Sequence, residues 1–382
     1  DRTKNLFEGM WPLPYGVSYN SYLIDDEMVA LVDTVDICYF EVYLRKIKQV
    51  IGDRPIDYLI INHMEPDHSG SIRLIKQHYP NIVIVGNKLT FGMIEGFYGV
   101  TGEQYLVKDG DCLALGVHKL RFHLTPMVHW PETMMTFDET DGILFSGDGF
   151  GCFGTVDGGF LDTRINIDRC WDEMVRYYSN IVGKYGSPVQ KALQKLGGLP
   201  ISVICSTHGP VWTDNIPKVV GIYDRLSRYV AEEGVVIAYG SMYGNTEQMA
   251  EAIAAELSAQ GIRNIVMHNV SKSDPSYILA DIFRYKGLII GSPTYSNQIY
   301  PEVESLLSKI LVRELKGRYL GMFGSFTWAG AAVKRMAEFA EKSKFEVVGD
   351  PVEMKQAMKD ITYTQCENLA RAMADRLKKD RP

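Results

Sequence analysis

The six cysteines of this chain form no C-x-x-C pair; they stand apart at positions 38, 112, 152, 170, 205 and 366. This spacing excludes a disulfide framework and a zinc ribbon. Cys38, Cys112 and Cys205 lie in or beside apolar segments, which predicts that they are small core residues. Because the cysteine pattern does not indicate disulfides, which form in oxidising compartments, we expect the protein to be located in the reducing cytoplasm.

Long apolar runs and excess positive charge are also lacking. No stretch approaches the length of a transmembrane helix, and the first ten residues, DRTKNLFEGM, carry no signal-peptide apolar segment. The net charge of −7 argues against nucleic acid or an anionic membrane as the main partner. The 382 residues, 46% hydrophobic and 23% charged, predict a globular protein of two or three domains.

The sequence becomes regular from about residue 235, where short apolar runs alternate with helical stretches. Met249, Ile253 and Leu257 recur at helical spacing and form one buried stripe. Five strands with intervening helices predict an α/β domain with a doubly wound parallel sheet of flavodoxin size. The expected strands are VVIAYG (235–240), NIVMHNV (264–270), GLIIGSP (287–293), YLGMFGS (319–325) and FEVVGD (345–350).

The first part of the chain is less regular, and its strand-like runs are separated by loops rich in Gly and Pro. Helices are expected around 40–51 and 168–182, and a loop with a closing helix over 209–233. We therefore predict a mixed αβ domain with two sheets at 1–233 and a second domain at 234–382. The expected strands are 58–61, 82–86, 119–124, 143–146 and 201–205.

Side chains that bind metals follow four of these strands, at the point where each strand ends. The strand YLII leads directly into the turn H-x-E-x-D-H, and three further runs each end in a His or an Asp. Strand ends converge on one edge of an α/β fold, so the side chains are expected to meet. Four imidazoles and three carboxylates are too many for one ion but suit two with a bridging carboxylate. The set is His63, Glu65, Asp67, His68, His129, Asp148 and His208.

A single His or Asp on a loop is more often solvated or locally hydrogen-bonded than bound to a metal. The repeated strand-to-loop context argues against that reading for the set of seven. We expect the remaining four histidines to be solvated or locally hydrogen-bonded, because they have no ligand-type neighbours in the sequence. They are His78, His118, His123 and His268.

The spacing of the seven residues resembles the metallo-β-lactamase fold in the version found in flavodiiron proteins of class A. Zinc hydrolases of that fold carry H-x-H-x-D-H, and Glu65 replaces the middle His with a hard anionic donor that favours iron. The resemblance implies an αββα sandwich in which Asp148 bridges two irons. It assigns one iron to His63, Glu65 and His129, and the other to Asp67, His208 and, least firmly, His68.

Neighbouring segments carry the same resemblance, namely FEGMWPLPYGVSYNSYLI (7–24), HWPETM (129–134) and STHGPVW (206–212). Trp130, Tyr177 and Tyr178 are candidates to line the site and tune proton delivery. They fit equally well as core aromatics.

Three loops of the second domain predict a binding site for a ligand that has an anionic group and a flat ring. SMYGNTEQMA (241–250) places hydroxyl, amide and backbone N–H groups at a helix N-terminus, without Lys or Arg. This loop alone could be only the N-terminal cap of a helix. GSPTYSNQ (291–298) and GSFTWAGA (324–331) follow the third and fourth strands, and in the strand order 2-1-3-4-5 all three loops surround the topological switch point.

These loops resemble the flavodoxin domain of flavodiiron proteins, which implies FMN as cofactor with Tyr295 and Trp328 at the isoalloxazine ring. Thr327 and Ala331 depart from the family, which more often has Gly there. The residues implied in binding are Ser241, Met242, Tyr243, Gly244, Asn245, Thr246, Ser292, Pro293, Thr294, Tyr295, Asn297, Ser325, Phe326, Thr327, Trp328, Ala329 and Gly330.

The resemblance covers the whole chain and implies an oxidoreductase that reduces nitric oxide to nitrous oxide, dioxygen to water, or both. It also implies a head-to-tail homodimer that brings the FMN of one subunit to the irons of the other. Such a dimer can stand alone or be part of a tetramer. The chain has no rubredoxin module, so the implied electron donor is a separate protein, rubredoxin, or else a reduced deazaflavin. The alternatives are a metal-dependent hydrolase with an accessory flavodoxin domain and a redox sensor without turnover.

Overall fold

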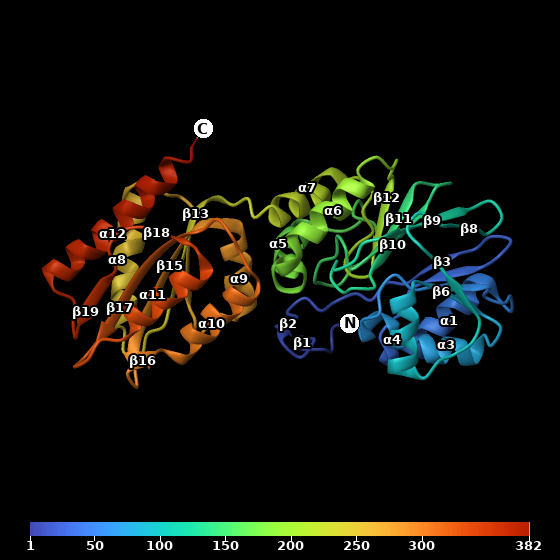
Figure 1. Ribbon diagram of the computed structural model, residues 1–382, viewed down its shortest axis with the longest axis horizontal. Helices are drawn as coiled ribbons and strands as arrows, with labels where there is room; N and C mark the ends of the chain where they lie inside the picture. The colour runs from blue at the N-terminus through green and yellow to red at the C-terminus, as the bar shows by residue number, and fades with distance from the viewer. Residues whose placement is uncertain (382) are drawn as a thin grey trace. The chain divides into compact units, whose positions relative to one another are not determined.

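The computed structural model describes residues 1–381 (Figure 1). Its contacts divide the chain into two compact units, one of Asp1–Ser227 and one that begins at Arg228. The boundary predicted between residues 233 and 234 falls inside strand β13 (Glu232–Tyr239) and stays a prediction.

The first unit is built on two five-stranded sheets. In the first sheet β3 pairs antiparallel with β4, and the remaining pairs are parallel. Its order is β3 (Tyr22–Ile24), β4 (Ala30–Val32), β5 (Tyr58–Ile60), β6 (Val83–Gly86) and β7 (Gln104–Leu106). The second sheet has the order β12 (Val203–Ser206), β11 (Ile143–Gly147), β10 (Met134–Asp138), β9 (Lys119–Leu124) and β8 (Cys112–Ala114).

The three central strands of the first sheet, β4 to β6, are largely buried, and their successive side chains point to opposite faces. Leu59 belongs to the core that this sheet shares with α1 and α3, whereas Ile60 belongs to the core that also contains Phe122 and Phe145 of the second sheet. The α-helices of this unit are α1 (Phe40–Ile51), α2 (Pro66–Ser69), α3 (Ile72–His78), α4 (Lys88–Tyr98), α5 (Asp168–Tyr177), α6 (Gly186–Leu196) and α7 (Ile216–Ser227).

Helices α1, α3 and α4 cover the outer face of the first sheet, and their apolar residues share one core. Tyr43, Leu44, Ile47 and Ile51 of α1 are buried in the same core as Ile72 of α3. The helix expected around 168–182 is α5 followed by a π-helical turn at Tyr178–Val182. The layers confirm the αββα sandwich that the resemblance implied.

The second unit is a parallel sheet in the order β14 (Ile265–Asn269), β13, β15 (Tyr285–Tyr295), β17 (Tyr319–Phe326) and β18 (Glu346–Val347). This is the predicted order 2-1-3-4-5. The fifth strand is split, because β19 (Val352–Lys355) also pairs with β17 after a short interruption. A short antiparallel strand, β16 (Gln298–Ile299), folds back on the end of β15.

Helices lie on both faces of this sheet (Figure 1). Val235 and Ile237 of β13 share a core with Met249, Ile253 and other residues of α8 and α12. The stripe predicted for residues 249–257 is therefore the buried face of α8. The helices are α8 (Asn245–Ala259), α9 (Pro275–Arg284), α10 (Pro301–Val312), α11 (Ala332–Ser343) and α12 (Asp360–Lys378).

The cysteine predictions hold only in part. Cys205 is a buried core residue, but Cys112 is half-buried and Cys38 is exposed. Cys38 lies in a short 3₁₀ turn, Ile37–Tyr39, that contributes no buried side chain. An apolar neighbourhood in the sequence therefore did not imply burial, because the turn lies at the surface.

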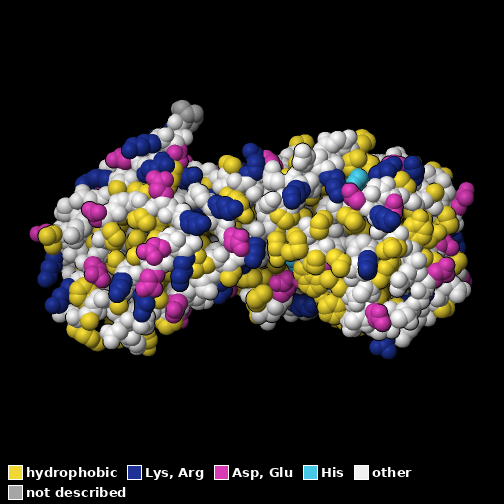
Figure 2. Space-filling model, viewed as in Figure 1, with side chains coloured by type: hydrophobic (Ala, Val, Ile, Leu, Met, Phe, Trp, Pro, Cys, Tyr) yellow, Lys and Arg dark blue, Asp and Glu magenta, His cyan; other side chains and the backbone are white. Residues whose placement is uncertain are grey.

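Within residues 1–381 no helix is long and apolar enough to cross a lipid bilayer. The face of the molecule drawn in Figure 2 carries Lys, Arg, Asp and Glu side chains interspersed with apolar ones. No large field of one charge sign is visible on that face, in keeping with the small net charge of −7.

Candidate metal centre and flavin cleft

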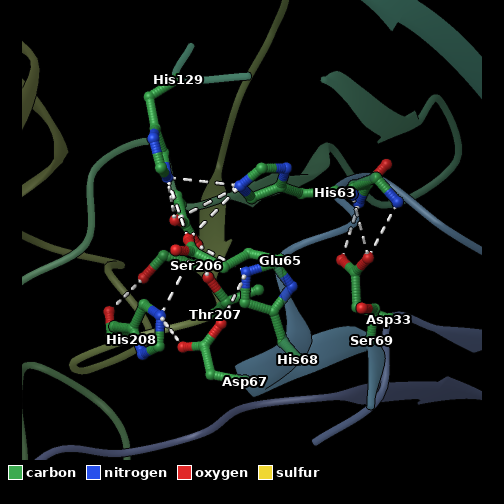
Figure 3. A network of polar contacts seen from close by, with 12 residues as sticks. Asp33, His63, Glu65, Asp67, His68, Ser69, His129, Ser206, Thr207 and His208 are labelled. Carbon is green, nitrogen blue, oxygen red and sulfur yellow. Dashed lines mark hydrogen bonds and ion pairs between the residues drawn. The ribbon is translucent and has the colours of Figure 1, made fainter. Parts of the chain in front are cut away.

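The turn that carries the first ligand candidates is fixed by a buried aspartate. Oδ1 of Asp33 accepts hydrogen bonds from the backbone N–H of Asn62 at 2.8 Å and of His63 at 3.4 Å (Figure 3). Pro66 then opens the short helix α2, where it needs no hydrogen-bonded N–H. This helix places Asp67 and His68 next to His63 and Glu65 on the same side of the turn.

The seven predicted ligands gather into two adjoining groups, and in each group the donor atoms lie within 4.8 Å of one another. In the first, Nε2 of His129 lies 3.0 Å from Oε2 of Glu65 and 3.3 Å from Nε2 of His63. In the second, Nε2 of His208 lies 3.2 Å from Oδ2 of Asp67, and Nε2 of His68 lies 3.4 Å from Oδ1.

Asp148 lies between the two groups and presents one oxygen to each. Its Oδ2 is 3.1 Å from Nε2 of His129 and 3.8 Å from Nε2 of His63. Its Oδ1 is 3.2 Å from Nε2 of His68 and 3.6 Å from Nε2 of His208. A carboxylate in this position is arranged to bridge two cations.

The residues fit a pair of metal ions. Both carboxylate oxygens of Asp67 and the Nε2 atoms of His68 and His208 are buried without a hydrogen bond. Burying such groups unsatisfied costs about 1–3 kcal/mol each. Cations held between them would satisfy all four atoms, and the all-N/O donor set suits iron better than a soft metal.

Two of the other ligands, His129 and Asp148, pair with each other. Burial works to lower the pKa of His129, but hydrogen bonds to Asp148 and Glu65 outweigh it and raise this pKa well above its usual value. Burial likewise works to raise the pKa of Asp148, and the charges of His68 and His129 hold it well below its usual value. Cations would replace the protons of the imidazoles, so metal binding releases protons.

Three further groups orient the ligands, and the sequence analysis missed all three as functional residues. Oε1 of Glu132 lies 2.7 Å from Nδ1 of His63, and Oγ1 of Thr207 donates to Oδ1 of Asp148 at 2.5 Å. The carbonyl of Ser18 lies 2.8 Å from Nδ1 of His208. The only sequence signal was proximity: Glu132 and Thr207 lie next to predicted ligands, in HWPETM and STHGPVW.

The three predicted aromatic residues have different surroundings. The Trp130 ring packs edge-on against His63, with ring centres 5.2 Å apart. The Tyr177 ring lies 5.8 Å from that of His208, and its buried hydroxyl has no hydrogen-bond partner. Tyr178 packs against Tyr223 at 5.1 Å and points its ring to a core aromatic instead of a ligand. A role for any of them in the site stays a prediction.

His118 is a hydrogen-bonded imidazole, as predicted for the histidines outside the set of seven, but acidic groups from elsewhere in the chain lie beside it. Its Nδ1 lies 2.9 Å from Oδ2 of Asp138, and Asp141 completes a third group able to hold a metal. The neighbours come from the next strand and its turn, so they were not visible in the local sequence. Asp141 is exposed, and exposed acidic groups of this kind are common without a metal.

A cleft of about 680 Å³ opens at the ends of β13, β15 and β17 in the second unit. Four large side chains stand exposed around it: Tyr243 is 90% exposed, Trp328 84%, Tyr295 47% and Met242 45%. Such exposure is costly in water and fits a site for a flat, largely apolar ring.

The polar part of the cleft is assembled from hydroxyls and a helix start. Oγ of Ser241 accepts the N–H of Gly244 at 3.2 Å, and Oγ1 of Thr246 bonds to Oγ of Ser325 at 2.8 Å. Gly244 precedes α8 in a left-handed conformation (φ 88°), which turns the chain into the helix. The described lining contains no Lys or Arg, so an anion here would be held by dipoles.

Two family models match the chain. The model described as "ODP family beta lactamase" matches residues 17–209, and the model described as "Flavodoxin" matches residues 237–369. An anaerobic nitric oxide reductase flavorubredoxin of Vibrio vulnificus is 34% identical over 341 residues, which cover 87% of this chain and 68% of that protein. The chain belongs to the flavodiiron proteins.

Solved structures agree with this family. Rubredoxin oxygen:oxidoreductase of Desulfovibrio gigas matches with a TM-score of 0.95 and 30% identity, covering 99% of this chain and 95% of that one. The flavodiiron protein from Giardia intestinalis matches with a TM-score of 0.93 and 27% identity, covering 100% and 95%. As a flavodiiron protein the chain is an oxidoreductase, with FMN and a diiron centre as its cofactors.

The cleft of this flavodiiron protein differs in detail from the predicted set. Gly244, Ser292 and Gly330 do not line it: Ser292 is buried and its Oγ accepts the N–H of Tyr300 at 3.0 Å. Ser296, Gln356 and Ala357 line it and were missed. Of the two departures from the family, Thr327 lines the cleft, whereas the N–H of Ala331 donates to Oγ1 of Thr294 at 3.0 Å.

Proposed function

We propose that the protein reduces a small diatomic molecule, nitric oxide to nitrous oxide or dioxygen to water, with electrons that pass from FMN to the diiron centre. Two nitric oxide molecules, two electrons and two protons give one nitrous oxide and one water. One dioxygen, four electrons and four protons give two waters.

The position of Asp148 is the observation that carries this proposal. Each of its carboxylate oxygens faces one of the two ligand groups, at 3.1 Å from His129 and 3.2 Å from His68. Two ions bridged in this way are close enough to act on one small substrate.

We assign His63, Glu65 and His129 to one iron and Asp67, His68 and His208 to the other, with Asp148 as the bridge. Two ferrous ions held by these residues would supply two reducing equivalents. Glu65 is the residue that favours iron over zinc, since its hard anionic oxygen stabilises the ferric state.

Apolar rings shield one side of the site. Phe7 packs edge-on against His208 with ring centres 5.4 Å apart, and Phe153 packs against Tyr177 at 5.1 Å. Excluding water here strengthens the electrostatic interactions of the ligands. The hydroxyl of Tyr177 is buried without a hydrogen-bond partner, and we propose it as the group that delivers a proton during turnover.

In the second unit, Ser241, Asn245 and Thr246 at the start of α8 are suited to hold the FMN phosphate. Tyr295 and Trp328 are suited to contact the isoalloxazine ring, because both line the cleft and are largely exposed without it. The remaining lining residues would contact the ribityl chain and the ring edge.

The proposal includes a head-to-tail homodimer, alone or within a tetramer, so that the FMN of one subunit serves the irons of the other. It includes rubredoxin as the separate electron donor, consistent with the rubredoxin oxygen:oxidoreductase that matches this fold. The reducing cytoplasm stays the predicted location.

Steady-state turnover with both gases tests the proposal. The anaerobically reduced holoprotein is mixed with excess reduced rubredoxin, and electrodes follow the consumption of nitric oxide and dioxygen in parallel runs. Repeated consumption of one gas identifies the substrate, and comparable rates identify a dual scavenger. No consumption by protein that contains both iron and FMN would reject the reductase and favour the sensor.

Metal analysis separates the reductase from the hydrolase, which would carry zinc and would hydrolyse esters or lactams without a reductant. His78→Gln serves as the matched control, since His78 is exposed and belongs to none of the groups able to hold a metal. It should keep the iron content and turnover of the parent protein, whereas His129→Gln should lose both.

A further inference from the structure

Two thiols that the proposed function does not use lie together in the first unit. The side chains of Cys152 and Cys170 line the same pocket, although 17 residues separate them in the sequence. Cys152 lies in the loop after β11 and is fully buried; Cys170 lies in the first turn of α5 and is half-buried.

Cys170 has the surroundings of a reactive thiol. It lines a pocket of about 130 Å³ together with Arg169, Cys152 and Asn166, which gives a small reagent access to its sulfur. The neighbouring Cys152 thiol and the charge of Arg169 lower the pKa of Cys170, against the opposing effects of burial and of the Glu173 charge. Its place in the first turn of a helix also favours the thiolate, which is the nucleophilic form.

Cys152 has the surroundings of a second, resolving thiol. A Cβ at Gly209 would lie 2.5 Å from its Sγ, so the sulfur is pressed against the backbone directly after His208. The neighbouring Cys170 thiol and burial together raise the pKa of Cys152 well above the usual value. It therefore stays protonated until its partner has reacted.

We propose that Cys170 and Cys152 form a peroxide-reactive thiol pair that converts reversibly to a disulfide. The Cys170 thiolate attacks one oxygen of hydrogen peroxide, the O–O bond breaks, and hydroxide leaves to become water; Cys170 is then a sulfenic acid. Cys152 sulfur attacks the Cys170 sulfur, the S–O bond breaks, and a second water leaves with the Cys152 proton. In sum, two thiols lose two electrons to one peroxide, and an external dithiol restores them by exchange.

The other cysteines lack this combination of access and a partner. Cys38 is exposed but stands alone, and burial raises its pKa. Cys205 and Cys366 are buried, and burial raises the pKa of each to about 12. These thiols serve as internal references for the reactivity of Cys170.

The loop that holds Cys152 also holds Asp148, so the pair is positioned to affect the centre. The N–H of Gly151 donates to the carbonyl of Asp148 at 3.1 Å, and Cys152 follows at once. A disulfide would anchor this loop to α5. The thiol reaction itself goes beyond the proposed function and does not depend on it, so its test does not require turnover.

Thiol mapping of the holoprotein in its oxidised, diferric form tests the inference without ferrous–peroxide side reactions. The protein is treated with about one equivalent of hydrogen peroxide, quenched with catalase, alkylated, digested without reduction and analysed by mass spectrometry. We expect loss of two of the six free thiols and a Cys152–Cys170 linked peptide two hydrogen masses below its parts. Dithiothreitol should restore both thiols.

Variants isolate the order of steps. Cys152→Ala should leave Cys170 as a sulfenic acid that a dimedone probe labels, and Cys38→Ser should behave as the parent protein. In the parent protein at neutral pH, iodoacetamide should modify Cys170 at least about tenfold faster than Cys38.

Preferential oxidation of Cys38, or overoxidation of Cys170 without a linked peptide, would overturn the proposal. Both results are read from peptide masses, so neither depends on a variant that folds. A linked peptide in protein that consumes neither gas would support the thiol pair and reject only the reductase.

Discussion

Oε1 of Glu132 lies 2.7 Å from Nδ1 of His63 and 2.9 Å from the backbone N of Met64, so one buried carboxylate fixes both the ring and the turn that carries it. The pair directs Nε2 of His63 to the other ligands. Burial works to raise the pKa of Glu132, but the hydrogen bond and charge of His63 lower it, so the carboxylate is ionised at neutral pH. A charged acceptor behind a ligand imidazole increases its basicity toward a metal.

Glu132→Gln should therefore weaken metal binding by roughly 10- to 100-fold while the fold is kept, because the amide retains the shape but not the charge. Competition with a chelator measures the affinity, and circular dichroism checks the fold. Glu139→Gln is the control, since Glu139 pairs with Arg121 and Lys119 and touches no ligand. Equal affinities for parent and Glu132→Gln would contradict the role of this carboxylate.

Glu65→His should shift the metal content from iron toward zinc. The substitution restores the H-x-H-x-D-H pattern and replaces a hard anionic oxygen with a neutral nitrogen, which loses the preference for the ferric state. Growth in medium with equal iron and zinc, followed by elemental analysis of the purified protein, gives the ratio. An unchanged ratio would place metal selection elsewhere than at Glu65.

Tyr177→Phe should leave stability unchanged or slightly higher, because the hydroxyl that it removes is buried without a partner. If that hydroxyl serves turnover, kcat should fall by about 10²-fold while iron content and KM stay constant. Stopped-flow and steady-state measurements at several pH values separate this from a packing effect. Unchanged kcat would identify Tyr177 as a core aromatic, the alternative that the sequence left open.

The strands that were predicted are apolar runs between breaks, whereas short strands such as β3, β4 and β7 were not predicted. Residues 119–124 and 40–51 were predicted and observed with the same bounds, as β9 and α1. The ligand turn was visible because all four of its polar residues follow one strand. Family resemblance then supplied the pairing of distant segments, such as those of His63 and His129.

What escaped prediction depends on contacts between distant segments. Glu132 reaches His63 across 69 positions, and Asp138 meets His118 only because β9 and β10 pair. Gln356 joins the flavin cleft because the fifth strand is split and its second half runs beside β17. None of these residues belongs to a local pattern, so only the folded chain reveals them.

His118 should give the stability of the first unit a distinct pH dependence. Burial works to lower its pKa, but the hydrogen bond and charge of Asp138 raise it above the usual value of 6.5. A raised folded pKa means that the ion pair stabilises below about pH 6.5 and that this stability is lost as pH rises through the folded pKa. His118→Asn should therefore lower the free energy of unfolding most near pH 5.5 and least near pH 9. Urea unfolding of both proteins, with metals bound, measures the difference; a pH-independent cost would reject the ion pair.

Packing around Gly291 should limit that position to glycine. A Cβ there would lie 2.0 Å from Cζ of Phe323, its buried partner across β15 and β17. Gly291→Ala should destabilise the second unit by about 1–3 kcal/mol, because the ring must leave its position in a filled core. Gly221→Ala, in α7 with no atom within 4 Å of the added Cβ, should instead stabilise by about 0.5–1 kcal/mol. Urea unfolding with saturating FMN measures both.

A double-mutant cycle distinguishes this contact from general strain. Phe323→Leu alone should lower the free energy of unfolding. In the Gly291→Ala background the same substitution should lower it by less, because the smaller side chain makes room for the new methyl group. A coupling energy of about 1 kcal/mol or more would locate the clash at this ring. Additive costs would mean that the backbone of β15 moves instead, in which case the neighbouring flavin loop should shift as well and FMN affinity should fall.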